Sequence, residues 1–346
     1  MQVNVTTMPA TDVGGELKSV VVTGVGGYIA RYVAAELLES GYAVTGTVRS
    51  MNRADGITSA VGVRADTSNL SFAEADLLAD AGWKELMDGA DYVMHVASPF
   101  TLDEPKDESE LIAPAVEGTQ RVLRAAEDSG VQRIVVTSSV LTLFMGRGSG
   151  HYGPDSWSDV NAKIGAYAKS KTLAEQTAWQ LAEGMKTQVT TVLPGYVIGP
   201  AIDGIPEGAS ASTISDMING KLPGIPDLWI PMVDVRDVAR LHVAAMESPE
   251  AAGKRLIGSQ SEPLPMGYLA KTLKSAGYTK VPGRKLPTVL VKVLSVFNKD
   301  ARSMVPYIGF RPSVDTSLPS EVCNWMAGSI DKGLLEMSHQ LTYSSR

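Results

Sequence analysis

Short apolar runs alternate with amphipathic stretches along the first two thirds of the chain. β-Branched apolar runs of this kind predict buried strands, and longer stretches with apolar positions three and four residues apart predict helices. The expected strands are 18–23, 43–48, 71–75, 92–96, 133–137 and 188–193. The expected helices are 28–40, 108–129 and 163–183. Strands that alternate with helices at this spacing predict an α/β fold, with a doubly wound parallel sheet of the Rossmann type.

The pattern changes after Pro194. Residues 195–228 are rich in Gly, Pro and Ser, and residues 262–319 hold many prolines among short helices. An amphipathic helix is expected over 234–247, and a strand over 254–257 that returns to the main sheet. The predicted organisation is a tail (1–16), a Rossmann domain (17–194 and about 230–260) and a smaller C-terminal substrate lobe (195–229 and 261–346).

Composition narrows the class of protein. The 346 residues are 44% hydrophobic and 20% charged, with a formal net charge of −7. Basic residues are not in excess, so nucleic acid is not expected as a partner. Cys323 is the single cysteine, which excludes an intrachain disulfide. Because no secretory signal is visible and no apolar run approaches roughly 18 residues, we expect a cytoplasmic protein without a membrane partner, either a monomer or a homodimer.

A glycine-rich segment joins the first expected strand to the first expected helix. It reads TGVGGYIA over 23–30, with Gly24, Gly27 and Ala30 three residues apart. Glycines at such a junction let the backbone approach a pyrophosphate, whose charge is met by the free N–H groups of the helix. A turn without a ligand is the alternative, but its place after the first strand favours a dinucleotide site. The predicted contacts are Gly24, Gly26, Gly27, Tyr28 and Ile29.

The end of the second strand indicates which dinucleotide is bound. Loops that bind NAD usually carry an acid there for the ribose 2′-OH. This chain instead reads GTVRS over 46–50, with no acid between Glu39 and Asp55. The guanidinium of Arg49 suits a 2′-phosphate, with Ser50 and Arg53 as helpers, so NADP(H) is the predicted cofactor. The alternative is a solvated arginine that follows a strand.

The ends of the next two strands supply further candidate contacts. Asp76 and Leu77 follow the third strand, where the adenine of a bound dinucleotide is expected, although a surface acid is nearly as plausible for Asp76. The small residues Val96, Ala97 and Ser98 end the fourth strand and suit close approach to the cofactor. His95 is expected to be a packed or capping histidine.

A tyrosine and a lysine stand four residues apart in YAKSK (167–171). On a helix, Tyr167 and Lys171 leave the same face, one turn apart. An ammonium beside a phenol is expected to lower the pKa of the phenol from about 10, which suits proton exchange with a carbonyl oxygen. The pairing alone is weak, because this spacing is common and Tyr167 could be an ordinary surface tyrosine of a helix.

Taken together, these segments resemble the extended short-chain dehydrogenases/reductases. The closest likeness is to the dihydroflavonol-reductase-like subgroup of NADPH carbonyl and aldehyde reductases, over about residues 18–260. The segments that carry it are TGVGGYIA (23–30), GTVRS (46–50), HVASP (95–99), PAVEGTQRVL (114–123), VVTSS (135–139), YAKSK (167–171) and LPGYVIGP (193–200).

The resemblance implies a catalytic set of Ser139, Tyr167 and Lys171. Ser139 would donate to the carbonyl oxygen, Tyr167 would deliver the proton, and Lys171 would hold the nicotinamide ribose and keep Tyr167 acidic. Further cofactor contacts are implied at Thr137, Pro194, Gly195 and Val197, with Tyr167 and Lys171 themselves. Many relatives place an asparagine where this chain has Pro114-Ala115-Val116, which leaves a relay through that residue in doubt.

The expected activity is NADPH-dependent reduction of a hydrophobic ketone or aldehyde to an alcohol. A predicted apolar pocket supports it, formed by Pro99, Phe100, Leu141, Phe144 and Tyr196. Reduction of cinnamoyl-CoA or a hydroxysteroid stays open, and a non-catalytic NADPH sensor is a distant alternative. Sugar-nucleotide dehydratases place Asp-Glu after the hydroxyl residue, where this chain has Val140-Leu141, and an epimerase would carry an acid near Arg49. No metal site is expected, since His151 and His242 lack ligand spacing and Cys323 has no catalytic partner.

Overall fold

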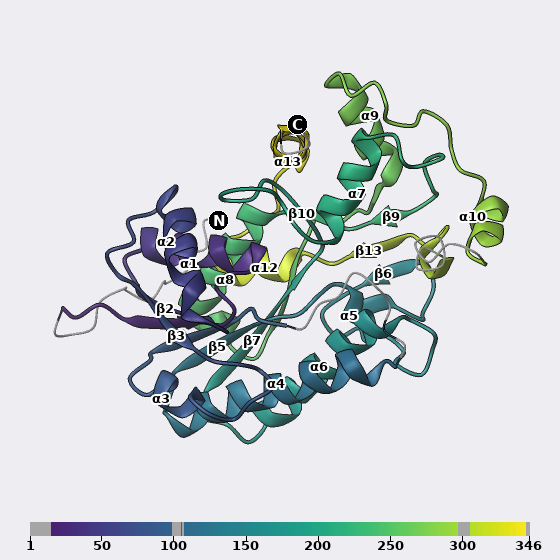
Figure 1. The fold of residues 1–346 in the computed structure, drawn as a ribbon. Coiled ribbons are helices and arrows are strands. Elements are labelled where there is room, and N and C mark those ends of the chain that lie inside the picture. Colours follow the sequence, from purple (N-terminus) through teal and green to yellow (C-terminus); the bar gives the residue numbers. More distant parts are fainter. Residues whose placement is uncertain (1–14, 99–104, 106, 297–304, 344–346) are drawn as a thin grey trace.

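The computed structural model describes residues 15–98, 105, 107–296 and 305–343 (Figure 1). Within them, a parallel sheet of seven strands has the order β11-β7-β5-β4-β1-β2-β3. In that order the strands are Arg255–Gly258, Gln188–Pro194, Arg133–Thr137, Tyr92–His95, Ser19–Val22, Ala43–Val48 and Leu70–Glu74. The order reverses between β1 and β4, where ligands bind in doubly wound sheets. The predicted α/β class is confirmed, and 254–257 does return to the sheet.

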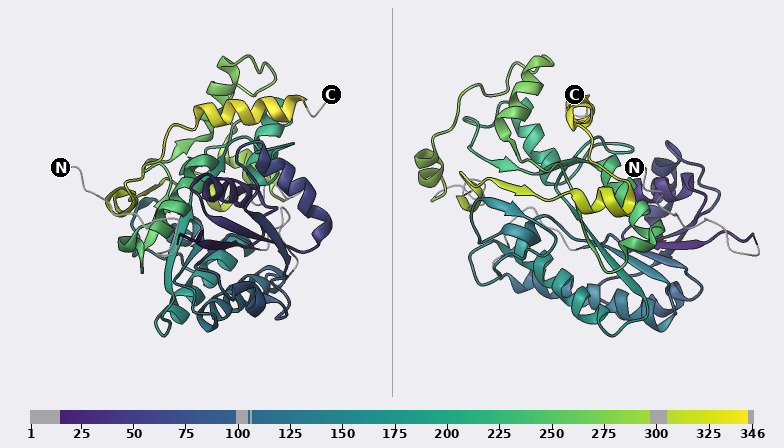
Figure 2. Two further views of the ribbon diagram at one scale, coloured as in Figure 1. Left: turned by 90° about the vertical axis from the view of Figure 1, so that its left-hand side faces the viewer. Right: turned by 180° about the vertical axis from the view of Figure 1, so that it is seen from behind.

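Helices cover both faces of the sheet. On one face α4 (Ser109–Asp128) packs against α6 (Ala166–Ala182), and on the other α1 (Tyr28–Glu39) packs against α8 (Val235–Glu247). Figures 1 and 2 show the two layers on either side of the strands. Two shorter helices, α2 (Ala54–Gly62) and α3 (Trp83–Met87), follow β2 and β3 and were not predicted from the sequence.

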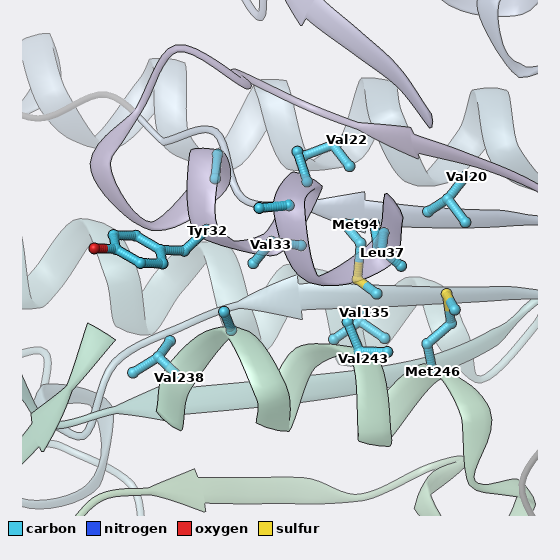
Figure 3. Close-up of a cluster of buried hydrophobic side chains, with 14 of the residues drawn as sticks. Val20, Val22, Tyr32, Val33, Leu37, Met94, Val135, Val238, Val243 and Met246 are labelled. Atoms are coloured by element: carbon cyan, nitrogen blue, oxygen red, sulfur yellow. The ribbon is translucent and has the colours of Figure 1, made fainter. Parts of the chain in front are cut away.

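The main core lies between the sheet and the α1/α8 layer. Figure 3 shows Val33 and Leu37 of α1 and Val238 of α8 in one cluster with Val20, Val22 and Val135 of the strands. These side chains are fully buried, which is why the corresponding runs read as apolar on one face of each helix. Each such side chain contributes roughly 1.5–3 kcal/mol by leaving water.

Glycines set the ends of two helices that matter for the site. Helix α1 ends at Glu39, and Gly41 follows with φ 85°, as the sequence predicts for a C-terminal glycine. Helix α6 begins at Ala166, three residues later than predicted, and Gly165 before it has φ 82°. Because this φ is outside the helical region, the helix does not extend back to Lys163.

The C-terminal lobe continues from the carboxyl end of β7 and has a buried cluster of its own. Its elements are β8 (Tyr196–Ile198), α7 (Ala209–Ile218), β9 (Trp229–Ile230), β10 (Met232–Asp234), β12 (Leu264–Pro265), α9 (Met266–Ser275), α10 (Thr288–Leu294) and α13 (Asp331–Tyr343). Strand β8 pairs with β10, and β9 with β12.

Part of the C-terminal segment packs back onto the Rossmann domain. Strand β13 (Pro312–Val314) pairs in parallel with β6 (Gly150–Tyr152), and α12 (Ser317–Cys323) contacts α8 and β11. Cys323 is buried in the main core. The end of the chain therefore covers both the lobe and one side of the sheet (Figure 2).

Candidate active site

Tyr167 and Lys171 lie one turn apart on α6, as predicted. Tyr167 is half-buried, and Lys171 is buried, with its Nζ donating to the carbonyl of Thr137 at 2.8 Å. Burial lowers the pKa of Lys171 to about 8. Burial also raises the pKa of Tyr167 to about 12, and the nearby phenol of Tyr307 adds to this rise. The predicted lowering of the pKa of Tyr167 by Lys171 is therefore wrong, because the cost of burying a phenolate sets the direction of the shift.

The two serines at the end of β5 have different partners. Ser138 Oγ donates to Glu175 Oε2 at 2.6 Å. Ser139 Oγ accepts the N–H of Leu141 at 3.2 Å, which leaves its own proton to be donated elsewhere. This difference supports Ser139, rather than Ser138, as the hydroxyl available to a substrate.

The glycines of the loop before α1 let a ligand come close to the backbone. Gly24 has φ 64°, and a Cβ on it would come within 2.9 Å of Ala97 Cβ. Gly27 precedes α1 in an extended conformation, with no side chain capping the helix. The first-turn N–H groups of α1 therefore keep the arrangement that binds a pyrophosphate. A Cβ on Gly26 would lie 3.5 Å from the guanidinium carbon of Arg53, so this arginine lies beside the loop.

The residues predicted for the 2′-phosphate and the adenine lie at the ends of β2 and β3. Arg49 is exposed directly after β2. Asp76 Oδ1 accepts the N–H of Leu78 at 3.0 Å, so this acid also orders its own turn. Leu77 packs against α4 at Gly118, where a Cβ would meet Leu77 Cβ at 3.0 Å. Arg49, Asp76 and Leu77 therefore stand at the carboxyl edge of the sheet, on the β2–β3 side.

His95 is a packed histidine in a chain of buried hydrogen bonds. Thr119 Oγ1 donates to the carbonyl of Ala115, so His95 Nε2 donates to Thr119 (3.4 Å) and Nδ1 accepts from Thr23 Oγ1 (3.0 Å). Thr23 Oγ1 in turn accepts the N–H of Ala97 at 3.0 Å. Burial lowers the pKa of His95 to about 3, so it stays neutral. These bonds fix the turn of Val96, Ala97 and Ser98 beside the glycine loop.

In the segment after β7, several backbone groups that were predicted to contact the cofactor form hydrogen bonds within the protein. The Pro194 carbonyl accepts from Val140, and the N–H of Gly195 donates to Gly258 at 3.0 Å. Val197 pairs with Val233 in the β8–β10 ladder. A Cβ on Gly195 would come within 2.6 Å of the Pro231 carbonyl, which explains the glycine. A cofactor contact at Pro194, Gly195 or Val197 stays a prediction, as does one at Thr137 and at Ile29.

Tyr28 holds the lobe to the first helix. Its Oη donates to the carbonyl of Gly199 at 2.6 Å, and Tyr32 Oη donates to the carbonyl of Pro200 at 3.1 Å. Tyr28 therefore has a structural partner in addition to its predicted place at the cofactor.

An aromatic cluster stands beside the catalytic candidates. Phe144 is buried, with its ring 5.8 Å from that of Tyr152 and 5.4 Å from that of Phe310. Tyr307 packs against the same cluster. Neither Phe310 nor Tyr307 was predicted, because they come from the proline-rich C-terminal stretch, which carries no local signal. Pro99 and Phe100, predicted for the pocket, lie outside the described residues.

Two other predicted residues keep contacts within the protein. Leu141 begins α5 (Leu141–Phe144), directly after the candidate serines. Tyr196 Oη contacts Thr213 Oγ1 at 2.9 Å, and burial raises the pKa of this tyrosine to about 12.

In the described ranges no group of three or more His, Cys, Asp or Glu residues could hold a metal ion. Among the same residues, no helix has the length and apolar character needed to cross a membrane.

Comparison with known proteins identifies the family. Residues 20–257 match the model of the NAD dependent epimerase/dehydratase family. The chain is 34% identical over 254 residues to cinnamoyl-CoA reductase 1 of Arabidopsis thaliana, covering 70% of this chain and 71% of that protein. It is 33% identical over 272 residues to a putative NADPH-dependent methylglyoxal reductase of Candida albicans, covering 70% of this chain and 78% of the relative.

Solved structures show the same fold. A yeast methylglyoxal/isovaleraldehyde reductase complexed with NADPH superposes with a TM-score of 0.79 at 24% identity. The match covers 94% of this chain and 99% of the yeast protein. The resemblance predicted from the seven sequence segments is confirmed: this chain belongs to the NAD dependent epimerase/dehydratase family, within the extended short-chain dehydrogenases/reductases.

Proposed function

We propose that this protein is an NADPH-dependent carbonyl reductase that converts a hydrophobic ketone or aldehyde to an alcohol. The observation that carries the proposal is that Lys171, one turn beyond Tyr167 on α6, donates to the Thr137 carbonyl at the end of β5, two residues before the hydroxyl of Ser139. Relatives named as NADPH-dependent methylglyoxal reductases support both the reaction class and the cofactor.

The residues present fit NADP(H). The glycine cradle of Gly24 and Gly27 opens toward the start of α1, where a Cβ on Gly24 would collide with Ala97. Arg53 lies beside this loop, and the exposed Arg49 directly follows β2, a strand without an acid, which suits the extra phosphate of NADP(H). When bound, NADPH supplies the hydride that reduces the carbonyl carbon.

The side chains of the chain supply the proton and the electrostatics. With a pKa of about 12, Tyr167 is protonated at neutral pH and so is ready to donate its proton to the carbonyl oxygen. Ser139 would donate a hydrogen bond to the same oxygen as negative charge develops there. Lys171, with a pKa of about 8, is mainly charged at pH 7 and would stabilise the phenolate that Tyr167 leaves.

The apolar surroundings support a hydrophobic substrate. Phe144, Tyr152 and Phe310 form the aromatic cluster next to the site, and the helix that carries Phe144 follows the candidate serines directly. The test is an NADPH-oxidation screen with aliphatic and aryl aldehydes, ketones and keto esters. Turnover of at least one class with NADPH, and much slower turnover with NADH, is expected. A folded, NADPH-binding protein that oxidises NADPH with none of them would contradict the proposal.

A second candidate is reduction of an acyl-CoA thioester to an aldehyde, favoured by the 34% identity to a cinnamoyl-CoA reductase. This reaction releases coenzyme A, so a free thiol appears in step with NADPH oxidation. The single cysteine, Cys323, is buried, so it adds little background to a thiol assay. Thiol release with cinnamoyl-CoA would favour this second function, whereas NADPH oxidation by aldehydes alone would favour the first.

A further inference from the structure

Glu175 lies one helical turn beyond Lys171 and is almost completely buried, with 1% of its surface exposed. Arg255 of β11 pairs with it, with Nε–Oε1 at 2.8 Å and a second contact to Oε2 at 3.1 Å. Ser138, directly after β5, donates to it at 2.6 Å, and Thr191 of β7 at 2.8 Å. One carboxylate therefore connects the helix that carries the tyrosine and lysine to three strands of the sheet.

Arg255 is held as firmly as its partner. Its guanidinium donates to the carbonyls of Pro154 and Ser156, both at 2.6 Å, and to Thr142 Oγ1 at 3.0 Å. The guanidinium carbon also lies 3.7 Å from the ring centre of Trp157. The five N–H groups of this cation all have acceptors within the protein, so Arg255 holds and orients Glu175 rather than meeting a ligand.

Lys171 and Glu175 face a common cavity. This cavity measures about 10 Å³, and its lining also includes Ser138, His95 and Thr119. A volume of this size has room for about one water molecule, so solvent screens the two charges poorly. Across it the carboxylate of Glu175 raises the pKa of Lys171, against the lowering by burial.

The other titratable groups that face Lys171 carry no charge near neutral pH. His95 of β4 has a pKa of about 3, and His242 of α8 has a pKa of about 4. Tyr167, one helical turn before Lys171, is protonated as well, with a pKa of about 12. Glu175 is thus the group whose negative charge supports the ammonium of Lys171, and Arg255 is its ion-pair partner.

We propose that Glu175 is a positioning residue: its carboxylate, oriented by Arg255, fixes Ser138 next to Ser139 and keeps Lys171 in its charged form. Ser138 acts on Ser139 through the backbone, since the two residues are neighbours directly after β5. The inference rests on the proposed function for the roles of Ser139 and Lys171, but the charge on Lys171 can be measured without turnover.

The test is a titration of Lys171 by NMR in the full-length protein labelled with ¹³C at lysine Cε, with its signal assigned by its loss in Lys171→Met. A midpoint near pH 8 is expected for the wild type. Glu175→Gln should move this midpoint to lower pH, because the supporting negative charge is removed while the amide preserves the shape. The matched control is Glu183→Gln, which removes an exposed acid at the end of the same helix and should move nothing.

Turnover supplies the second readout. With a carbonyl substrate from the screen, Glu175→Gln should lower kcat roughly 10- to 100-fold, the cost of a displaced catalytic group, and Glu183→Gln should leave kcat unchanged. The high-pH limb of the kcat profile should move down in the same direction as the NMR midpoint. A shifted midpoint in a protein that reduces no carbonyl would contradict the proposed function and leave the role of Glu175 toward Lys171 supported.

The double variant Glu175→Gln/Arg255→Gln covers the case in which the single variant does not fold. It leaves no unpaired buried charge, so its stability should exceed that of the single variant. Its Lys171 midpoint should still lie below the wild-type value. An unchanged midpoint in either folded variant would overturn the proposal, and so would failure of both variants to fold, which would give the pair a purely structural role.

Discussion

Helices α6 and α8 lie on opposite faces of the sheet, and both bury charged side chains against it. The charges of α6 lie at the carboxyl end of β5. There Lys171 donates to the Thr137 carbonyl, and Glu175 accepts from the Ser138 hydroxyl. The charges at the start of α8 contact a different part of the chain. Asp237 accepts the N–H of Gly328 at 2.7 Å, and so holds the C-terminal segment rather than the site.

The same contrast extends through the partners of α8. Asp234 caps the helix and binds Arg236, whose other nitrogen donates to Glu336 of α13 at 2.8 Å. A Cβ on Gly333 of α13 would collide with Asp234, so the two helices meet closely at this point. Buried charge alone therefore does not identify a site. The charges of α6 contact residues at the carboxyl end of a central strand, whereas those of α8 contact the C-terminal segment of the chain.

Ser139 should show the largest effect among the side chains that flank Tyr167. Ser139→Ala is expected to lower kcat roughly 10²- to 10³-fold, because it removes a donor to the developing oxyanion. Steady-state kinetics with a carbonyl substrate measures this, and differential scanning fluorimetry should show little change in Tm. The comparison variant is the neighbouring Ser138→Ala, which loses its hydrogen bond to Glu175 and should lower kcat by less than Ser139→Ala, because Ser138 donates to a carboxylate and not to the substrate. Equal losses in the two variants would remove the distinction between the serines.

Arg49 tests the cofactor side of the site. Arg49→Ala should weaken NADPH binding roughly 10- to 100-fold, the range for losing charge-assisted hydrogen bonds, with little change for NADH. Fluorescence titration with the two nucleotides measures both affinities. Arg124→Ala, an exposed arginine on α4, is the matched control and should alter neither. Parallel losses for NADPH and NADH would show that Arg49 does not read the 2′-phosphate.

Asp237 tests the scaffold side of the comparison. Asp237→Asn is expected to lower the free energy of unfolding by about 2 kcal/mol, because a buried carboxylate loses its charge-assisted bonds to Gly328 and Arg240. Urea unfolding measures the stability, and kcat of the folded variant should stay close to that of the wild type. A variant of normal stability with a large loss of kcat would place α8 in the catalytic machinery and break the comparison.

The sequence predicts the parts of this molecule that depend on short segments. The glycine loop before Tyr28 and the Tyr167/Lys171 spacing are local patterns, and each constrains its own backbone within one or two turns. Partnerships across the fold could not be predicted in this way. Glu175 and Arg255 are 80 positions apart, and they meet because β11 pairs with β7 while α6 packs against β7.

The error in the pKa of Tyr167 has the same origin. The spacing on the helix predicts an ammonium one turn from the phenol, but the loss of water around that phenol depends on what the rest of the fold packs against it. Tyr307 from the C-terminal stretch raises the pKa of Tyr167 further, and nothing in the YAKSK segment predicts its presence. The direction of a pKa shift thus depends on the whole fold, whereas the identity of the pair does not.

The most direct test of the account is Tyr167→Phe, which removes the phenolic hydroxyl and keeps the ring. Turnover of the carbonyl substrate should fall roughly 10²- to 10⁴-fold, the usual contribution of general acid catalysis. NADPH affinity, measured by fluorescence titration on the same preparation, should stay within a factor of about two, because Lys171 and the glycine loop are intact. Turnover that persists at the wild-type rate with normal NADPH binding would contradict the assignment of Tyr167 as the proton donor.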